Sequence, residues 1–368
     1  MAGLIESVAA AGGTAPSHAA TPPHLAPPPT GPRAGSGTTG SFINPLYHGA
    51  DPCVVRHGGT YYACQTGPGN RIEIWKSATL TARGERRVVW TAPDRGWNRA
   101  QVWAPELHRI DGRWYIYYAA SSGHNAAHRM GVLAATTDDP QGPFEDAGQL
   151  YTGDHVATRA QNRWAIDGTV FTLRDRLYFA WSGWEDHRDV QHLYLAEMSD
   201  PTTIATDRLK LCPNDCHPWE RVGDRHWERG LHEGPQVLQR NGRVLLVYSC
   251  SGSWQPTYKL GMLYMDERSD PMSPGAWTKY PAPVFESTRD VFGVGHCCFT
   301  ESPDGTEDWL LYHSKRFRWD CWSREVRAQK FSWRGDGFPD FGRPASSGVP
   351  LALPAGDTAP AVPERRVA

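Results

Sequence analysis

Residues 167–181 read Asp-Gly-Thr-Val-Phe-Thr-Leu-Arg-Asp-Arg-Leu-Tyr-Phe-Ala-Trp. An ionisable residue, Asp167, leads into a short apolar strand. A tight turn follows at 174–176, and an aromatic strand begins at Leu177. Apolar, β-branched and aromatic runs separated by a short polar turn are typical of a β-hairpin. The fold can be predicted from this stretch because the chain repeats it.

The same unit occurs five times along the chain, at separations of 55 to 66 residues. Several of its turns are Asp-Gly or Asn-Gly pairs, which favour two-residue hairpins. A third apolar strand recurs in four of the copies. A long period with several strands per unit is typical of a β-propeller, whose blades are small sheets around a central channel. We predict an all-β, five-bladed β-propeller, with a β-sandwich or two small β domains as the alternative. The five copies begin at Asp51, Glu106, Asp167, Glu233 and His296.

The composition excludes several classes of protein. The 368 residues contain 38 Lys plus Arg and 40 Asp plus Glu, so the charge balance does not favour a nucleic-acid or anionic-membrane partner. No run approaches the roughly 18 apolar residues that a membrane span needs. Aromatic residues are numerous, with 16 Trp, 14 Tyr and 11 Phe, although only 39% of the chain is hydrophobic. We expect most of these rings to pack between blades and a few to line a binding pocket.

Both ends of the chain differ in composition from the repeats. Residues 1–40 contain 7 Pro and 7 Gly, a composition typical of a flexible tail without a fold. Residues 345–368 are similarly rich in Pro, Ala and Gly, which leaves 41–344 as the folded domain. No basic segment followed by an apolar stretch of a secretory signal is visible near the start. We therefore expect a cytoplasmic protein, with secretion as the alternative.

The repeat also predicts where ionisable residues meet. The first strand of every propeller blade lies innermost, so the five residues that begin the copies are expected to converge on one pocket at one end of the channel. Carboxylates that face one another raise each other's pKa, which stability alone does not favour. Glycoside hydrolysis uses such a pair, since one carboxyl protonates the leaving oxygen and the other activates water or attacks the sugar. Aromatic faces suit the C–H face of a sugar.

The chain resembles glycoside hydrolase family 43, the five-bladed propeller glycosidases, over about residues 42–344. The similarity rests on Ala50-Asp-Pro, Trp103-Ala-Pro-Glu-Leu, Ile166-Asp-Gly-Thr-Val-Phe, His232-Glu-Gly-Pro-Gln-Val-Leu and Arg327-Ala-Gln-Lys-Phe, in that order. The resemblance implies an enzyme that inverts the anomeric configuration and needs no cofactor for its chemistry. It implies Asp51 as the general base, Glu233 as the general acid, and Asp167 as the residue that orients the acid and raises its pKa. Glu106 is interpreted as structural.

The resemblance also implies residues around the catalytic set. Trp103 resembles the ring that lines the sugar subsite, and Arg327 a cation on the substrate side. Trp181 and Trp184 are further candidates for the pocket. His296 is implied to lie near a central cation, commonly calcium, although Cys297 and Cys298 beside it are bulkier than the small polar residues expected there.

The segment from Gly112 to Met130 and the closing strand near Arg327 look most like the α-L-arabinofuranosidase branch. The implied substrate is a terminal α-L-arabinofuranose on arabinan-type oligo- or polysaccharides. A β-xylosidase or another furanosidase of the family stays open, as do endo action and the oligomeric state. A sugar-binding propeller without catalysis is a less favoured interpretation. So is a zinc site built from nearby Cys and His side chains, which are Cys212, Cys216, His217, His226 and His232.

Overall fold

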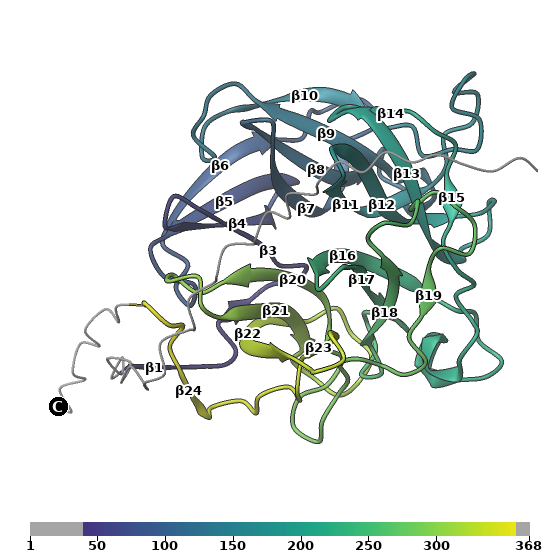
Figure 1. Ribbon diagram of the computed structural model, residues 1–368. Coiled ribbons are helices and arrows are strands. Elements are labelled where there is room, and N and C mark those ends of the chain that lie inside the picture. Colours follow the sequence, from purple (N-terminus) through teal and green to yellow (C-terminus); the bar gives the residue numbers. More distant parts are fainter. Residues whose placement is uncertain (1–39, 358–368) are drawn as a thin grey trace, which may run out of the picture. The chain divides into compact units, whose positions relative to one another are not determined.

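The computed structural model describes residues 40–357. Within the described residues, five antiparallel sheets of four or five strands succeed one another along the chain (Figure 1). This architecture confirms the predicted five-bladed β-propeller. No helix in this part of the chain is long and apolar enough to cross a bilayer.

Each blade is built from consecutive strands, with the innermost first. The first contains β3 (Cys53–His57), β4 (Thr60–Gly67), β5 (Arg71–Ser77) and β6 (Glu85–Thr91). The second contains β7 (Ala100–Ile110), β8 (Arg113–Ser121), β9 (Arg129–Ala135) and β10 (Phe144–Gln149). The third contains β11 (Ala165–Leu173), β12 (Arg176–Trp184), β13 (Gln191–Asp200), β14 (Thr203–Ile204) and β15 (Leu209–Lys210). The fourth contains β16 (His232–Arg240), β17 (Arg243–Cys250), β18 (Lys259–Asp266) and β19 (Thr278–Lys279).

The fifth blade closes the ring with a strand from the other end of the domain. It contains β20 (Gly295–Glu301), β21 (Asp308–Lys315), β22 (Arg324–Trp333) and β23 (Pro339–Asp340). The early strand β2 (Tyr47–His48) pairs with β22 in this sheet. The inner strands β20 and β3 also contact each other, so the last blade lies against the first. Three short 3₁₀ helices, η1 (Asn125–Ala127), η2 (Pro218–Glu220) and η3 (Val222–Asp224), lie in connecting segments.

The hairpin turns follow directly from local sequence. Asp111 and Gly112, between β7 and β8, both have positive φ angles of 49° and 82°. Asn241 and Gly242, between β16 and β17, repeat this with 55° and 74°. A two-residue turn with both central residues in this region matches the twist of the flanking strands, and Asp, Asn and Gly adopt it at the lowest cost. The register of the inner hairpins is therefore set by residues next to one another in the chain.

The aromatic surplus fills the spaces between blades. The second strands carry many fully buried rings, among them Tyr117, Tyr178, Trp181, Tyr248 and Tyr312. One apolar cluster joins residues of the second and third blades, and another joins the fourth and fifth. Rings supply large buried areas where aliphatic residues are scarce. Most of the tryptophans and tyrosines are thus used for packing, as the sequence suggested.

The domain boundaries differ from the expected ones at the C-terminal side. Residues 345–357, expected to belong to a flexible tail, include β24 (Pro350–Ala352), which pairs with β1 (Ser41–Ile43). Arg327 binds this segment through the carbonyl oxygen of Ala345 and the hydroxyl of Ser347. The ordered chain therefore continues past 344, because backbone pairing offsets a composition rich in Pro and Gly. The expected tail over residues 1–39 and the stretch 358–368 lie outside the described residues.

Candidate active site

The inner strands share a break in register at one end. The pairing shifts between Trp103 and Glu106 in β7, between Ile166 and Thr169 in β11, between Glu233 and Gln236 in β16, and between Gly295 and Cys298 in β20. One residue at each break has a positive φ angle, and Asp51, just before β3, has one as well. Such β-bulges re-aim side chains next to functional sites. These five residues are Asp51, Ala104, Asp167, Gly234 and His296.

This alignment corrects the position of Glu106 in the repeat. Glu106 lies after the break, paired with Tyr117, and corresponds to Thr169 and Gln236 in the next two blades. Its carboxylate is buried and accepts a hydrogen bond from the side chain of Gln236. It does not line the cavity. Four of the five expected ionisable residues therefore converge, and the fifth lies deeper among the inner strands.

A cavity of about 660 Å³ opens at the end of the inner strands where these breaks lie. Its size falls within the range of small-molecule sites, and polar groups alternate on its wall with aromatic rings. The four converging residues all belong to it. Its lining consists of Asp51, Trp103, Asn125, Trp164, Ile166, Asp167, Asp189, Gln191, Arg229, Glu233, Ser253, Trp254, His296, Trp322 and Arg324.

Asp51 lies beside Arg324, His296 and His313, of which His313 is neutral near pH 7 because burial lowers its pKa to about 3. Its Oδ1 lies 3.0 Å from Arg324 Nη1, 3.3 Å from His296 Nδ1 and 3.2 Å from His313 Nδ1. Burial by itself opposes ionisation, but Arg324, His296 and His313 together hold the pKa of Asp51 well below its usual range. This carboxyl group therefore stays ionised, which is the state that can accept a proton.

Glu233 lies in a different electrostatic environment. Its Oε1 accepts a hydrogen bond of 2.8 Å from Tyr258, and its Oε2 accepts one of 3.0 Å from Gln191. Burial outweighs these two neutral donors, so the pKa of Glu233 is raised. A carboxyl group with a raised pKa retains its proton near neutral pH and can donate it.

Asp167 connects the two groups. Its Oδ2 accepts a hydrogen bond of 3.1 Å from the backbone N–H of Gly234, the residue after Glu233. Burial, together with the nearby carboxylates of Glu233 and Asp51, raises the pKa of Asp167. Burial favours a neutral His296, but Asp51, Asp167 and Glu233 together raise the pKa of that imidazole. The cavity thus holds three carboxyl groups around one shared cation.

The surroundings of His296 bear on the expected calcium site. Its Nδ1 lies 3.3 Å from Asp51 Oδ1 and 3.8 Å from Asp167 Oδ2, an arrangement in which the imidazole carries a proton. A protonated ring nitrogen has no lone pair for a metal ion. Among the residues that the structure describes, no group of three or more His, Cys, Asp or Glu side chains is arranged to hold a metal. The expected calcium therefore gains no support from this geometry.

The aromatic wall of the cavity only partly matches the expected rings. Trp103 lines the cavity and stacks on His128, with ring centroids 3.8 Å apart. Trp181 and Trp184, the further candidates, do not line it. Trp181 is fully buried within its blade, and Trp184 stacks behind Trp164 at 4.6 Å. Trp164 is the ring that reaches the cavity.

The expected substrate-side arginine is also at a different position. Arg327 is buried, and it bonds Ser314, Glu325 and the segment after 344. Arg324 lines the cavity instead and bonds Asp51. Two residues three apart on one strand face opposite sides of the sheet, so only one of them can reach the cavity. Arg327 therefore stabilises the last blade, whereas Arg324 lies beside the carboxylate of Asp51.

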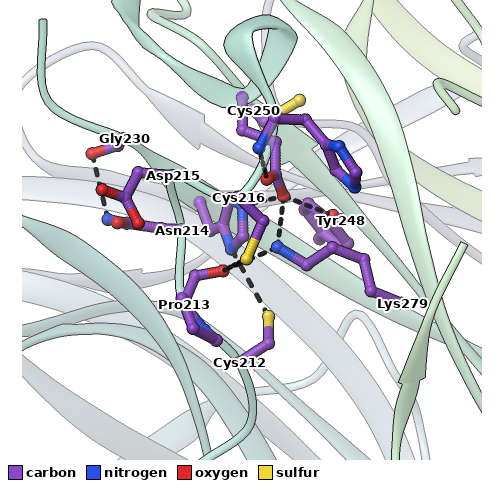
Figure 2. Close-up of polar contacts among 12 residues, drawn as sticks. Cys212, Pro213, Asn214, Asp215, Cys216, Gly230, Tyr248, Cys250 and Lys279 are labelled. Carbon is purple, nitrogen blue, oxygen red and sulfur yellow. Dashed lines mark hydrogen bonds and ion pairs between the residues drawn. The ribbon is translucent and has the colours of Figure 1, made fainter. Parts of the chain in front are cut away.

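Two of the side chains considered as zinc ligands, Cys212 and His232, belong to a polar network around Glu220, and Figure 2 shows this region with Cys212, Tyr248 and Lys279 labelled. Tyr248 and Lys279 both donate to Glu220, and His232 lies 2.8 Å from the same carboxylate. Cys212 Sγ lies 3.9 Å from His232 Nδ1, whereas Cys216 is exposed and near the carbonyl oxygen of Pro213. Both cysteines are free thiols in the structure. The cluster is a polar core next to β16.

Sequence reasoning missed several residues that hold the carboxyl groups. Gln191 begins β13 and Tyr258 precedes β18, and both donate to Glu233. Tyr258 also stacks on His313, with centroids 5.4 Å apart, and His313 contacts Asp51. None of these residues belongs to a local motif. Each lies near the end of a strand on the cavity side. This position in the repeat is the one feature of the sequence from which they could have been predicted.

The comparisons with known proteins identify the family of the chain. The family model for glycosyl hydrolases family 43 matches residues 42–339. The chain belongs to this family. It is 37% identical over 287 residues to an extracellular exo-α-(1→5)-L-arabinofuranosidase of Streptomyces chartreusis, covering 75% of this chain and 83% of that protein. A relative of the same name from Streptomyces avermitilis is 34% identical, with 84% of this chain and 65% of that protein covered.

A solved structure supports the same assignment. The crystal structure of an α-L-arabinofuranosidase from Lactobacillus brevis is 35% identical, with a TM-score of 0.75, and the match covers 84% of this chain and 98% of that one. This family 43 chain is therefore a glycoside hydrolase, as the sequence predicted. The expected cytoplasmic location is contradicted, because the two Streptomyces relatives are named extracellular enzymes.

Proposed function

We propose that this protein is an inverting, exo-acting α-L-arabinofuranosidase, which releases terminal α-L-arabinofuranose from arabinan-type oligo- or polysaccharides. The observation that carries the proposal is the opposite tuning of two carboxyl groups in one cavity. The pKa of Asp51 is lowered by Arg324 and two histidines, whereas burial raises that of Glu233. The names of the relatives support the substrate.

The two groups have complementary parts in this reaction. Asp51 takes a proton from water while the water oxygen bonds to the anomeric carbon from one face. Glu233 gives its proton to the glycosidic oxygen as the bond from that oxygen to the anomeric carbon breaks on the other face. Asp51 ends protonated and Glu233 ionised, and exchange with water restores both. The new bond forms opposite the old one, so the configuration is inverted.

Asp167 acts on the acid in this proposal. Its hydrogen bond to the N–H of Gly234 fixes the backbone beside Glu233. The repulsion by which Glu233 raises the pKa of Asp167 acts equally in the other direction, so the pair titrates as a unit. Trp103 and Trp164 supply ring surfaces for the terminal sugar. A calcium ion at His296 is not part of the proposal, because no group of three or more His, Cys, Asp or Glu side chains is arranged to hold a metal among the described residues.

A panel of nitrophenyl α-L-arabinofuranoside, β-D-xylopyranoside and β-D-galactofuranoside tests the proposal, with the released anomer followed by NMR. We expect hydrolysis of the arabinofuranoside, with β-arabinofuranose as the first product. Faster hydrolysis of the xylopyranoside would instead identify a β-xylosidase. A first product of α configuration would contradict inversion. No hydrolysis of any substrate, with linear arabino-oligosaccharides also inert, would contradict the proposed activity.

A further inference from the structure

Two connecting segments at the cavity carry accessible tryptophan rings. Segment 251–258, between β17 and β18, carries Trp254, and segment 316–323, between β21 and β22, carries Trp322. Their ring centroids lie 5.4 Å apart at an interplanar angle of 48°. Trp322 is 65% exposed, yet both rings line the cavity that contains Asp51 and Glu233. The pair forms an aromatic rim that is continuous with the catalytic cavity.

A buried lysine ties the two segments together. The Nζ of Lys315 donates to the carbonyl oxygens of Trp254 and Cys321, one from each segment. Lys315 is only 2% exposed, and within residues 40–357 no carboxylate lies within ion-pair distance of it. Its stem passes Gly293, where an added Cβ would lie 2.6 Å from it. The backbone N–H of Cys321 also donates to the carbonyl oxygen of Trp254, at 2.9 Å.

The burial of the Lys315 ammonium group costs free energy, which suggests that the contacts it makes have a function. An ammonium group taken out of water without a carboxylate partner is expensive to bury, and two carbonyl hydrogen bonds only partly offset that cost. The lysine fixes the backbone of Trp254 relative to that of Cys321, the residue before Trp322. A rim held in place before a ligand arrives loses little entropy on binding, which favours affinity.

The tryptophan rings that line the cavity differ in their exposure to solvent. Trp164 is buried, Trp103 and Trp254 are half-buried, and Trp322 is exposed. A volume of about 660 Å³ is in the range that takes drug-sized ligands, which is more than one pentose needs. A terminal sugar at the buried rings leaves the exposed rings for the sugars attached to it.

We propose that Trp254 and Trp322 form the binding surface for the leaving-group sugars of an arabino-oligosaccharide, held in place by Lys315. This inference rests on the proposed function and deepens it. The C–H faces of pentose residues pack on the indole rings, so each additional residue beyond the scissile bond adds contact area. The protein is then selective for oligosaccharides over substrates that carry a small aryl leaving group.

Binding of α-(1→5)-linked arabinotriose tests the rim independently of hydrolysis. Calorimetry is carried out on Glu233→Gln, with and without Trp322→Ala, and Trp227→Ala serves as the control. Trp227 is 68% exposed but does not line the cavity. We expect about a tenfold weaker affinity with Trp322→Ala and no change with Trp227→Ala. Equal affinity for arabinotriose in all three proteins, or an equal loss of affinity in the two alanine variants, would contradict the proposed binding surface.

Kinetics on the active enzyme give a second measurement. The ratio of kcat/KM for arabinotriose to that for nitrophenyl arabinofuranoside is expected to fall at least fivefold in Trp322→Ala. We expect a similar fall in Lys315→Met, provided that its thermal unfolding shows a folded protein. An unchanged ratio in Trp322→Ala would overturn the inference and leave the proposed activity intact. A wild-type protein inactive on both substrates but able to bind arabinotriose through Trp322 would contradict the activity and not the rim.

Discussion

Two buried glutamates lie close to strand β16, and their surroundings give them opposite properties. Glu220 accepts hydrogen bonds from Tyr248, from Lys279 and from the backbone of His217, and it contacts His232. Burial opposes its ionisation, but His232 and Lys279 lower the pKa of Glu220 to about 2. Glu233 has only two neutral donors, and its pKa is raised.

The comparison shows that burial alone does not mark a functional carboxyl group. Glu220 is paired with a cationic lysine of its own, so its charge is satisfied and its function is structural. His296, which favours the ionised form of Glu233, also lies beside Asp51 and Asp167. His232 and Glu233 are consecutive residues, and the alternation of a strand sends one to the polar network and the other to the cavity. The difference predicts which substitution costs activity and which costs stability.

The largest expected effect is on turnover. Glu233→Gln and Asp51→Asn each remove a proton-transfer group without changing its shape, and such a group contributes about 10²–10⁴-fold to the rate. We expect losses of this size in kcat on nitrophenyl α-L-arabinofuranoside. The thermal unfolding of each variant checks that the fold is retained. Full activity of either variant would show that its residue has no part in the proposed chemistry. If the wild-type protein bound the sugar but did not hydrolyse it, the protein would be a binding propeller and not an enzyme.

Substitution of the structural glutamate has the opposite profile. Glu220→Ala leaves Lys279 and His232 without their partner, and breaking a buried ion pair in this way costs about 3–5 kcal/mol. We expect the free energy of unfolding, measured in urea, to decrease by an amount near the lower end of that range. The reason is that Lys279 is partly accessible to solvent. The kcat of the folded fraction is expected to stay within a few-fold of wild type. A variant as stable as wild type would show that the network carries little energy.

The smallest effect is a shift in the pH profile. The acid must carry its proton, so kcat/KM falls as the pH rises through the raised pKa of Glu233. The hydrogen bond from Tyr258 favours the ionised form of Glu233, and Tyr258→Phe removes it. The pKa of the acid therefore rises further, and the basic limb of the profile moves to higher pH, by about one unit or less. Movement towards lower pH, or none, would contradict the contact as a determinant of the acid's pKa.

The sequence predicted the fold well because its signals are local. Asp111-Gly112 and Asn241-Gly242 form tight hairpins from adjacent residues, and the alternation of apolar and aromatic strands repeats five times. The positions of Asp51, Asp167 and Glu233 in this repeat predicted that they meet. Their roles as base, orienting residue and acid remain a proposal. The family and the enzyme class predicted from the resemblance are confirmed by the family match.

Two of the errors concern where a side chain lies relative to the cavity, and both follow from the pairing of a strand with its neighbour. Glu106 appeared to begin its copy, but the break in β7 lies at Ala104, so Glu106 is two residues beyond it. Arg327 was expected at the substrate, but the pairing of β22 turns Arg324 to the cavity. A shift of a single residue moves every side chain to the other face of a sheet. Sequence alone does not show where a bulge adds that residue.

The number of blades and the family could therefore be read from the sequence, because each depends on patterns within a few neighbouring residues or on their repetition. Which ionisable groups share the cavity, and in which charge state, became clear only from the folded protein. The polar contacts in and around the cavity join residues far apart in the chain. They include the pairing of Asp51 with Arg324, the two hydrogen bonds to Glu233 and the hydrogen bond from Lys315 to Trp254. Charge states depend on such distances, and distances of this kind exist only after the propeller has closed.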